Sequence, residues 1–305
     1  MSFQLTILGC HSATPRVNAH PTSQVLQIKN HHFLIDCGEG TQVQMRKYKV
    51  GFSKIKHIFI SHLHGDHFFG LIGLISSFGL LNRESDLHIY GPKGLKEIIE
   101  LQLQVSQTRV AYKLVFHELV STKSELIFED KKVRVSTIPL KHRVYTNGFL
   151  FQEKESLRKL NIKTVEKYPE IEVCDYHNLK KGKDFILKDG TVLKNEVLTL
   201  DPPKPLSYAY CSDTSYNPAI IKIIKNTDLL YHEATFLEDR LELAHITGHS
   251  TALQAGKIAK AAGVKLLILG HYSNRYKDIK AFQKEAQQEF QNTLLCVEGN
   301  TFEIS

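Results

Sequence analysis

A dense group of metal-ligand side chains directly follows one apolar run. His62, His64, Asp66 and His67 lie within six residues, after the apolar residues of the run 55–60. An apolar run that stops at such a group predicts a buried strand that delivers the group to a loop. Imidazole nitrogen and carboxylate oxygen are ligands that zinc and similar metals prefer. A solvated histidine-rich turn is the alternative, but it explains neither the strand nor the distant partners described below.

Four ligand-type side chains exceed what one tetrahedral ion usually takes from a single loop. The loop therefore indicates either two metal ions that share it, or one ion and a catalytic acid. Asp36 follows a second strand-like run, residues 32–35, and lies beside glycines. It is well placed to support a site, although a turn or a helix cap would also explain it.

Further candidate ligands stand at the ends of other apolar runs. They are His142, Asp213, His232, Glu233 and His271. In layered α/β folds, the strand ends along one edge form a single rim, so residues far apart in the sequence can converge there. One strand-end histidine is usually structural or solvated, whereas several in one chain indicate a shared site.

Two adjacent metal ions and a proton donor suit the hydrolysis of a phosphodiester. Two such ions need ligands on both sides and usually one bridging carboxylate, and together they activate water and bind a phosphate oxygen. The leaving alkoxide needs a proton, which an imidazole held by a carboxylate can supply. His249 with Glu233 is the candidate pair. Alternatively, His249 faces solvent beside Ser250, the predicted N-cap of a helix over residues 251–262.

Composition narrows the class of protein and of partner. The chain has 305 residues, 42% of them hydrophobic, which is enough for a large core. No apolar run approaches about 18 residues, so we expect no membrane span. The five cysteines are scattered and the first residues lack a secretion signal, which predicts reduced thiols in the cytoplasm. The net charge of +7 favours a polyanionic partner such as nucleic acid.

The character of the sequence changes over residues 153–205. Hydrophobic periodicity weakens there, and the segment closes with the proline-rich run 201–205. We therefore predict one domain spanning residues 1–305, with residues 153–205 inserted as an arm. Basic and acidic residues nearly balance within the arm, so its basic character is confined to the patch 178–183.

Eight motifs together resemble one known family. SHLHGDH at residues 61–67 matches the HxHxDH signature of the metallo-β-lactamase superfamily. The wider set resembles ribonuclease Z, the tRNA 3′-processing endonucleases: LGCHSATP, FLIDCGEGTQ, SHLHGDHFFGL, PLKH, YCSDT, HEATF, the HIT-H-ST pattern at 245–251 and GHYSNRY. These motifs cover nearly the whole chain apart from the arm.

The resemblance implies a four-layer αββα sandwich that binds two zinc ions. It implies one zinc held by His62, His64 and His142. It implies a second zinc held by Asp66, His67 and His271, with Asp213 bridging the two ions. The substrate would be precursor tRNA, cut so that its 3′ trailer is removed and a 3′-hydroxyl remains on the tRNA.

The resemblance also implies roles around the metals. Asp66 would orient the attacking hydroxide, and His249, backed by Glu233, would assist departure of the 3′ oxygen. RNA phosphate near the site would be bound by three residues of the GHYSNRY motif: Ser273, Asn274 and Arg275. The enzyme would be a homodimer, in which the arm of one subunit holds the tRNA elbow cut by the other.

The arm departs from the family pattern. Members usually carry a Gly-Pro-rich segment where this chain has residues 167–183, and often an arginine–asparagine pair where it has His20-Pro21-Thr22. Aromatic and basic arm residues could still form an RNA-facing surface by stacking and phosphate contacts: Tyr168, Tyr176, His177, Lys180 and Lys181. The alternative is a solvated arm with a small hydrophobic anchor.

Two alternative functions are consistent with part of this interpretation. A phosphodiesterase acting on small phosphodiesters would use the same metal site with a different substrate. An RNA-binding protein with a vestigial site belongs to another class, and the full ligand set argues against it. A thiolesterase or lactamase is disfavoured by the motifs from HEATF to GHYSNRY.

Overall fold

The structure is a computed structural model that describes residues 3–304. The chain divides into two compact units. The main unit contains the chain up to residue 129, residues 133–152 and the chain from residue 206 onward, and the arm unit contains residues 130–132 and 153–205. Across residues 3–304, no helix is both long enough and apolar enough to cross a membrane.

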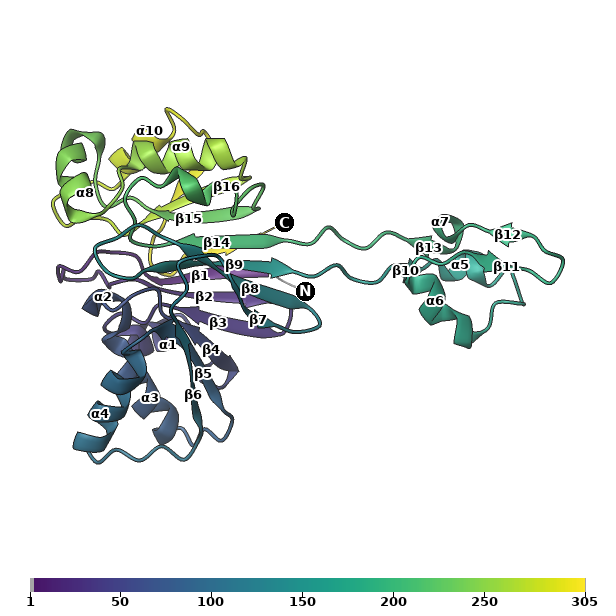
Figure 1. Cartoon of the computed structure of the whole chain (residues 1–305), viewed down its shortest axis with the longest axis horizontal. Helices are drawn as coiled ribbons and strands as arrows, with labels where there is room; N and C mark the ends of the chain where they lie inside the picture. The colour runs from purple at the N-terminus through teal and green to yellow at the C-terminus, as the bar shows by residue number, and fades with distance from the viewer. Residues whose placement is uncertain (1–2, 305) are drawn as a thin grey trace. The chain divides into compact units, whose positions relative to one another are not determined.

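Two mixed sheets form the middle layers of the main unit (Figure 1). The first has the strand order β18-β1-β2-β3-β4-β5-β6, with β1 Phe3–Gly9, β2 Ser23–Ile28, β3 His31–Ile35, β4 Ile55–Phe59, β5 Leu87–Pro92, β6 Leu114–Leu119 and β18 Thr301–Glu303. The second has the order β17-β16-β15-β14-β9-β8-β7, with β7 Leu126–Glu129, β8 Val133–Pro139, β9 Asn147–Glu153, β14 Ser207–Cys211, β15 Leu229–Glu233, β16 Leu266–Gly270 and β17 Thr293–Leu295. Strands β3 to β6 run parallel, as do β14 to β17, so the strands that lead to the candidate ligands end at a common edge.

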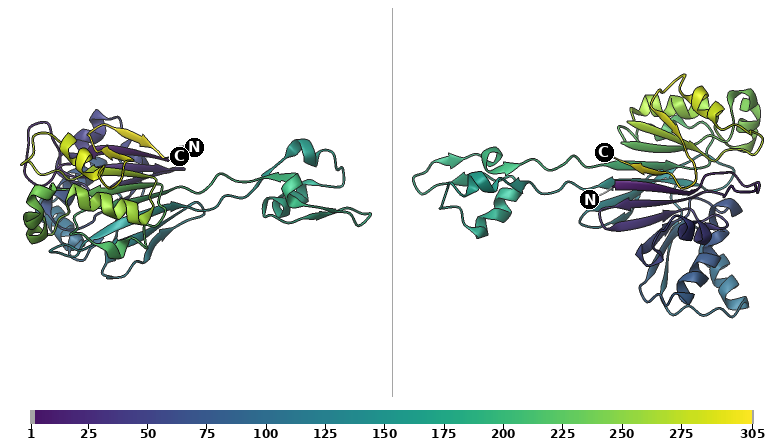
Figure 2. Two further views of the ribbon diagram at one scale, coloured as in Figure 1. Left: turned by 90° about the horizontal axis from the view of Figure 1, so that it is seen from above. Right: turned by 180° about the vertical axis from the view of Figure 1, so that it is seen from behind.

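Helices cover the outer faces of both sheets (Figures 1 and 2). On the first sheet lie α1 Thr41–Lys47, α2 Gly65–Phe68, α3 Gly70–Leu80 and α4 Leu95–Val105. With the second sheet lie α8 Leu241–Thr247, α9 Ala252–Ala262 and α10 Lys280–Ala286. The main unit also contains short 3-10 helices: η1 Phe52–Lys54, η3 Pro218–Ile220 and η4 Glu238–Arg240. The order helix–sheet–sheet–helix confirms the predicted αββα sandwich.

Alternation along the strands builds the two hydrophobic layers. On β3, Phe33 and Ile35 belong to the core between the sheets, whereas Leu34 belongs to the core beneath the helices. The rings of Phe33 and Phe151, from opposite sheets, lie 5.4 Å apart between centroids. Because successive side chains point to opposite faces of a strand, both faces must be apolar, which explains the nearly continuous apolar runs in the sequence.

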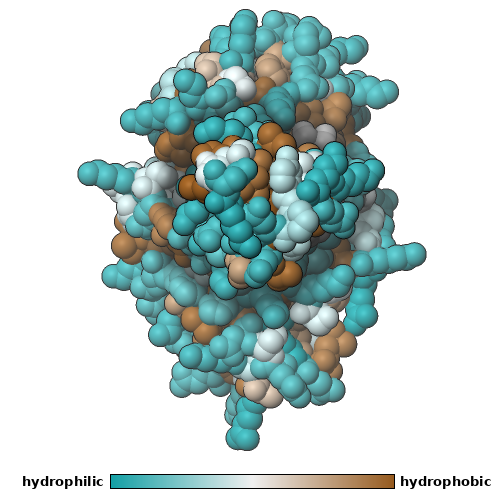
Figure 3. All heavy atoms as spheres, turned by 90° about the vertical axis from the view of Figure 1, so that its right-hand side faces the viewer, coloured by the Kyte–Doolittle hydropathy of each residue, from teal (hydrophilic) through white to brown (hydrophobic). Residues whose placement is uncertain are grey.

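The arm unit has its own small core. It contains β10 Lys159–Leu160, α5 Ile162–Val165, η2 Val173–Asp175, α6 Tyr176–Lys180, β11 Phe185–Ile186, β12 Val192–Leu193, α7 Asn195–Leu198 and β13 Thr199–Leu200. Four buried side chains meet at its centre: Val165, Ile171, Leu179 and Leu198. Figure 3 shows a largely hydrophilic surface on this unit with scattered hydrophobic side chains. A core this small anchors local structure and leaves most polar arm side chains exposed to solvent.

The start of helix α9 differs from the predicted one by one residue. The N-cap of α9 is Thr251 rather than Ser250, because Thr251 and Gln254 bond each other's backbone N–H in a reciprocal capping box. Ser250 instead donates its hydroxyl hydrogen bond to the carbonyl of Thr214 at 2.6 Å.

Three histidines stack across neighbouring strands of the first sheet. The rings of His57 and His88 lie 5.0 Å apart, and those of His88 and His117 lie 5.3 Å apart. His57 also packs at 4.7 Å against Phe128 of the second sheet. Burial, together with neighbouring His88, lowers the pKa of His57 to about 3. The neutral ring is therefore the form that this packing favours.

We expect acid to destabilise the protein partly through His57. The unfolded imidazole gains a proton below pH 6.5, whereas the folded one resists protonation down to about pH 3. Between these values, protonation of this group should lower the free energy of unfolding by at most about 1.4 kcal/mol for each unit by which the pH falls. Urea unfolding at pH 7, 6 and 5 should show a weaker pH dependence in His57→Phe. The exposed His245→Phe is the control, and an equal change in both variants would contradict the assignment.

Candidate active site

Every residue proposed as a metal ligand lies at or just beyond the end of a strand. The loop after β4 supplies His62 and His64, and α2, which follows at once, supplies Asp66 and His67. The other ligands follow strands that end at the same edge: His142 after β8, Asp213 after β14 and His271 after β16. The seven side chains form two clusters whose ligand atoms lie within 4.8 Å of one another.

The first cluster consists of His62, His64, His142 and Asp213. Nε2 of His62 lies 3.0 Å from Nδ1 of His64, and Nε2 of His142 lies 3.3 Å from the same atom. Oδ2 of Asp213 lies 3.5 Å from Nε2 of His62. Burial, together with His62 and His142, lowers the pKa of His64 to about 4, so this imidazole is in the neutral form that binds metals at pH 7.

The second cluster consists of Asp66, His67 and His271. Oδ2 of Asp66 lies 3.4 Å from Nε2 of His67 and 3.3 Å from Nε2 of His271. The other oxygen of Asp213, Oδ1, lies 3.3 Å from both of these nitrogens. The two oxygens of Asp213 thus face different clusters, which is the geometry of a bridging carboxylate.

The donor sets fit metal ions. Ligand atoms on a tetrahedral ion with bonds of 2.0–2.1 Å lie about 3.3 Å apart, close to the separations within both clusters. Nε2 of His67 is buried and has no hydrogen-bond partner among the described residues, although it faces two carboxylates. Burial would lower the pKa of His67, but the carboxylates of Asp213 and Asp66 raise it well above its usual value. The site therefore demands positive charge, which a metal ion supplies.

Asp36 holds the second cluster from behind. Its fully buried carboxylate accepts hydrogen bonds from Nδ1 of His67 at 2.7 Å and from the hydroxyl of Tyr210 at 2.6 Å. It also accepts from the backbone N–H of Ser61 at 2.7 Å and from the Ser61 hydroxyl at 2.8 Å. The bond to Nδ1 fixes the tautomer of His67 and directs Nε2 toward the cluster. The backbone of Asp36 has a left-handed φ of 52°, which a non-glycine residue rarely adopts without such support.

We expect Asp36→Asn to weaken metal binding and stability together. The amide places an N–H₂ group where the carboxylate accepted bonds, so at least one buried donor loses its partner. Metal affinity should fall by roughly 10- to 100-fold, and the free energy of unfolding by about 1–3 kcal/mol. Zinc titration and thermal unfolding measure the two effects, with the exposed Glu118→Gln as control. Unchanged zinc affinity would contradict a supporting role for Asp36.

His249 and Glu233 form a hydrogen-bonded pair beside the clusters. Nδ1 of His249 lies 2.9 Å from Oε1 of Glu233, which is fully buried. The same oxygen accepts hydrogen bonds from the backbone N–H groups of Thr214 and Ser250. Burial alone would lower the pKa of His249, but the Glu233 carboxylate raises it to about 9. The pair is therefore arranged to keep a proton on His249 at neutral pH.

Thr235 joins this pair to the second cluster. Its hydroxyl donates to Oε2 of Glu233 at 2.8 Å and lies 2.8 Å from Nδ1 of His271. The hydroxyl can therefore accept from Nδ1–H of His271, which leaves Nε2 of that ring for a metal ion. Thr235 lies in the motif HEATF but was not singled out from the sequence. The sequence feature that could have identified Thr235 is its position one residue beyond Ala234, just after a strand end rich in candidate ligands.

Some of the predicted residues lie elsewhere. His232 is buried, bonds the carbonyl of Glu233 at 2.7 Å and belongs to neither cluster, whereas its neighbour Glu233 bonds His249. Ser273 lines the cavity in front of the clusters, whereas Asn274 and Arg275 are exposed residues that follow it. Lys180 and Lys181 lie at the end of α6 in the arm unit.

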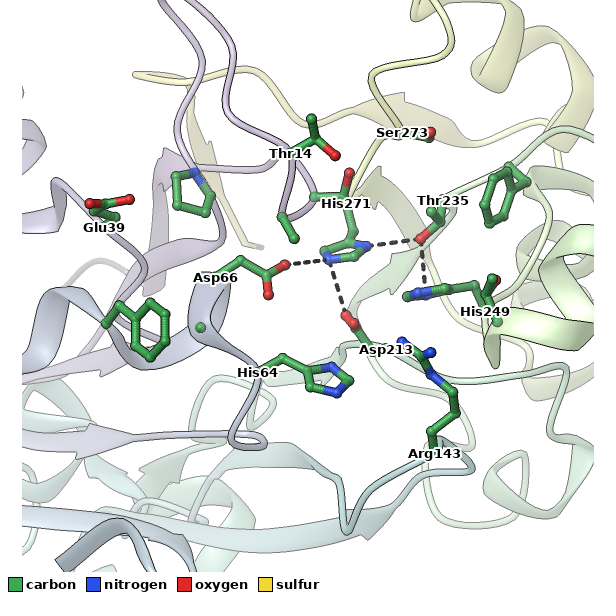
Figure 4. Close-up of a pocket in the computed structure, with 17 residues that line it drawn as sticks. Thr14, Glu39, His64, Asp66, Arg143, Asp213, Thr235, His249, His271 and Ser273 are labelled. Carbon is green, nitrogen blue, oxygen red and sulfur yellow. Dashed lines mark hydrogen bonds and ion pairs between the residues drawn. The ribbon is translucent and has the colours of Figure 1, made fainter. Parts of the chain in front are cut away.

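A cavity of about 600 Å³ opens onto the clusters and the pair. Asp66, Asp213, His249 and His271 line it, so the candidate ligands and the candidate proton donor face one space (Figure 4). Its walls also contain residues that the sequence did not single out: Thr14, Glu39, Phe69, Arg143, Thr247 and Phe236. The cavity can hold a phosphodiester and parts of the adjoining groups.

Comparisons with known proteins identify full-length relatives and one family model. A ribonuclease Z from Bacteroides fragilis is 46% identical over 297 residues, which is 97% of each chain. A ribonuclease Z from Bacteroides thetaiotaomicron is 46% identical over 303 residues, covering 99% of this chain and 96% of that one. The crystal structure of the short form of human tRNase Z superposes with a TM-score of 0.72 at 28% identity, over 99% of both chains. The family model described as anti-Pycsar protein Apyc1 matches residues 3–193.

Proposed function

The chain belongs to the ribonuclease Z family and, through residues 3–193, to the anti-Pycsar protein Apyc1 family, and we propose that it cleaves with two zinc ions. It is a tRNA 3′-processing endonuclease with a metallo-β-lactamase fold. In the proposed reaction it removes the 3′ trailer from precursor tRNA and leaves a 3′-hydroxyl on the tRNA.

One observation carries the two-metal proposal. The two oxygens of Asp213 face separate clusters, each completed by three further side chains. One zinc would be held by His62, His64 and His142, and the other by Asp66, His67 and His271. Zinc ions in such a pair lower the pKa of water and polarise phosphate oxygens. The mixed imidazole and carboxylate donors suit zinc, and a bridging carboxylate suits a pair of ions.

The protein's own groups supply orientation and the proton. The Asp66 carboxylate, on the cavity wall, orients the attacking water by accepting a hydrogen bond from it. Nδ1–H of His249 donates to Glu233, so Nε2–H of the protonated ring is free to donate to the departing 3′ oxygen. Ser273, Asn274 and Arg275 follow His271 directly, and we propose that they bind RNA phosphate beside the cavity.

The decisive experiment is cleavage of a tRNA precursor that carries a 3′ trailer. The purified, zinc-loaded protein should make one cut on the 3′ side of the acceptor stem, mapped to the nucleotide. The product should carry a 3′-hydroxyl, detected by its extension with a poly(A) polymerase. Hydrolysis of small phosphodiesters without a site-specific tRNA cut would instead favour the small-molecule phosphodiesterase.

We expect the arm lysines to act on binding rather than on bond cleavage. Replacing Lys180 and Lys181 with alanine removes two positive charges from the arm unit. Affinity for tRNA should fall roughly tenfold and depend less on salt concentration. Hydrolysis of a small aryl phosphodiester should change much less. The matched control replaces the exposed Lys222 and Lys225 of the main unit, and equal losses on both substrates would contradict the proposal.

We also propose a cytoplasmic homodimer, in which the arm of one subunit holds the tRNA elbow cut by the other. The five free thiols suit a reducing compartment. Family membership supports the dimer, and sedimentation equilibrium measures it directly.

A further inference from the structure

An aromatic ring and a guanidinium are among the cavity groups that have no role in the proposed reaction. Phe69 and Arg143 both line the cavity, on walls built by different parts of the chain. Phe69 follows α2, the helix that carries Asp66, and Arg143 follows His142. Phe69 is 61% exposed although it is a large aromatic residue. Arg143 is exposed and forms no hydrogen bond or ion pair that the structure of residues 3–304 records.

The ring of Phe69 is held in place on one side and open on the other. A Cβ atom at residue 65 would collide with this ring, so the ring lies directly against the bare backbone of Gly65. The backbone N–H of Phe69 donates to the carbonyl of Gly65 at 2.9 Å, and the ring of Phe68 meets it edge-on at 5.0 Å. An aromatic face supported in this way and exposed beside a catalytic cavity is suited to stacking a nucleic-acid base.

Arg143 belongs to another part of the cavity wall, and its guanidinium is unpaired among residues 3–304. A Cβ atom at Gly248 would lie 3.5 Å from Cγ of Arg143, so the side chain packs along the turn that carries His249. Figure 4 shows the guanidinium pointing into the cavity near Asp213 and His249. With no carboxylate of its own to neutralise, this fork of donors is suited to bind an RNA phosphate with two parallel hydrogen bonds.

Side chains of opposite charge lie on different sides of the cavity. Glu39 lines the cavity on the side away from Arg143 (Figure 4). A phosphate group is repelled by the carboxylate of Glu39 and attracted by the guanidinium of Arg143. His249, the donor to the departing 3′ oxygen, stands on the Arg143 side. The tRNA nucleotide that keeps this oxygen therefore belongs on the Arg143 wall, and the first trailer nucleotide extends toward Phe69.

We propose that Phe69 and Arg143 clamp the two nucleotides that flank the cut. The base of the first trailer nucleotide stacks on Phe69, and the phosphate on the 5′ side of the last tRNA nucleotide binds Arg143. Stacking accepts any base because every base has an aromatic face, so this contact positions the trailer without reading its sequence. Phe69 and Arg143 would thus position the substrate, and this assignment rests on the proposed function.

The stacking contact is tested with a matched pair of precursor tRNAs. One carries a normal first trailer nucleotide, and the other an abasic nucleotide at that position. Phe69→Ala should lower kcat/KM roughly tenfold or more on the normal precursor and hardly change it on the abasic one. Phe69→Trp should restore cleavage of the normal precursor. The same fractional loss on both precursors would overturn the stacking assignment.

The phosphate contact is tested in the same way. A precursor with a neutral methylphosphonate on the 5′ side of the last tRNA nucleotide lacks the charge that Arg143 would bind. On the normal precursor, Arg143→Ala should lower kcat/KM by roughly 10- to 100-fold, with Arg143→Lys intermediate. On the methylphosphonate precursor the wild-type and variant rates should converge. Equal losses of the variant on both precursors would overturn the phosphate assignment.

These experiments separate failure of the clamp from failure of the proposed function. Wild-type cleavage of the unmodified precursor is the baseline of both series, and its absence would overturn the function and the clamp together. The clamp alone would be overturned if the wild type cleaved the unmodified precursor normally and each variant lost the same factor in kcat/KM on the normal and the modified precursor. Zinc content of each variant, measured by atomic emission, should equal that of the wild type, because neither residue is a proposed ligand.

Discussion

Replacing His64 or Asp66 with alanine should lower cleavage of a tRNA precursor by at least about a thousandfold. Loss of a residue that only supports a ligand typically costs 10- to 100-fold, so loss of a ligand should cost more. His64 belongs to the first cluster and Asp66 to the second, and the remaining side chains of each cluster cannot enclose an ion equally well. Both residues line the cavity, so neither substitution disrupts a hydrophobic core.

Metal content distinguishes the two substitutions. Each variant should bind fewer than the two zinc ions per chain expected of the wild type, as measured by atomic emission after gel filtration. Asp66→Ala should also lose activity that added zinc does not restore, because Asp66 is proposed to orient the attacking water as well. The exposed His245→Ala is the control for general effects of histidine loss. Cleavage at the normal rate by either ligand variant would refute the metal mechanism.

The sequence predicted where candidate ligands lie more reliably than which way they point. Apolar runs mark the strands, and the parallel order of β14, β15 and β16 places their ends at one edge, where Asp213, Glu233 and His271 are found. His232 carried the same strand-end signal as Glu233. It belongs to neither cluster, because adjacent residues on a strand face opposite sides and only one of them can face the site.

Residues that act through another residue were harder to predict. Asp36 follows a strand, a position that a turn or a helix cap would also explain. Only its four hydrogen bonds, one of them with His67, indicate that it supports the site instead. Thr235 contacts Glu233 and His271 through a single hydroxyl, and no periodic pattern marks such a contact. Arg143 and Phe69 gain significance only from the cavity that they share, which depends on how loops far apart in the sequence close together.

The His249–Glu233 pair should contribute about 100- to 10,000-fold to cleavage, the usual range for a positioned proton donor. His249→Ala removes the donor outright. Glu233→Gln keeps the shape but faces Nδ1–H of His249 with a weaker, neutral acceptor and disturbs the bonds from Thr214 and Ser250. Both variants should retain the zinc content of the wild type, because neither residue is assigned as a ligand.

A substrate that needs no proton on its leaving group identifies the role of His249. In a precursor tRNA with sulfur in place of the departing 3′ oxygen, the leaving thiolate is stable without protonation. His249→Ala should therefore be rescued on this substrate, approaching the wild-type rate, while it stays strongly impaired on the normal one. A ligand variant such as His64→Ala should stay impaired on both, which makes it the matched control. If His249→Ala lost the same factor on both substrates, His249 would be acting in binding or folding, and Nε2–H would not be the source of the proton.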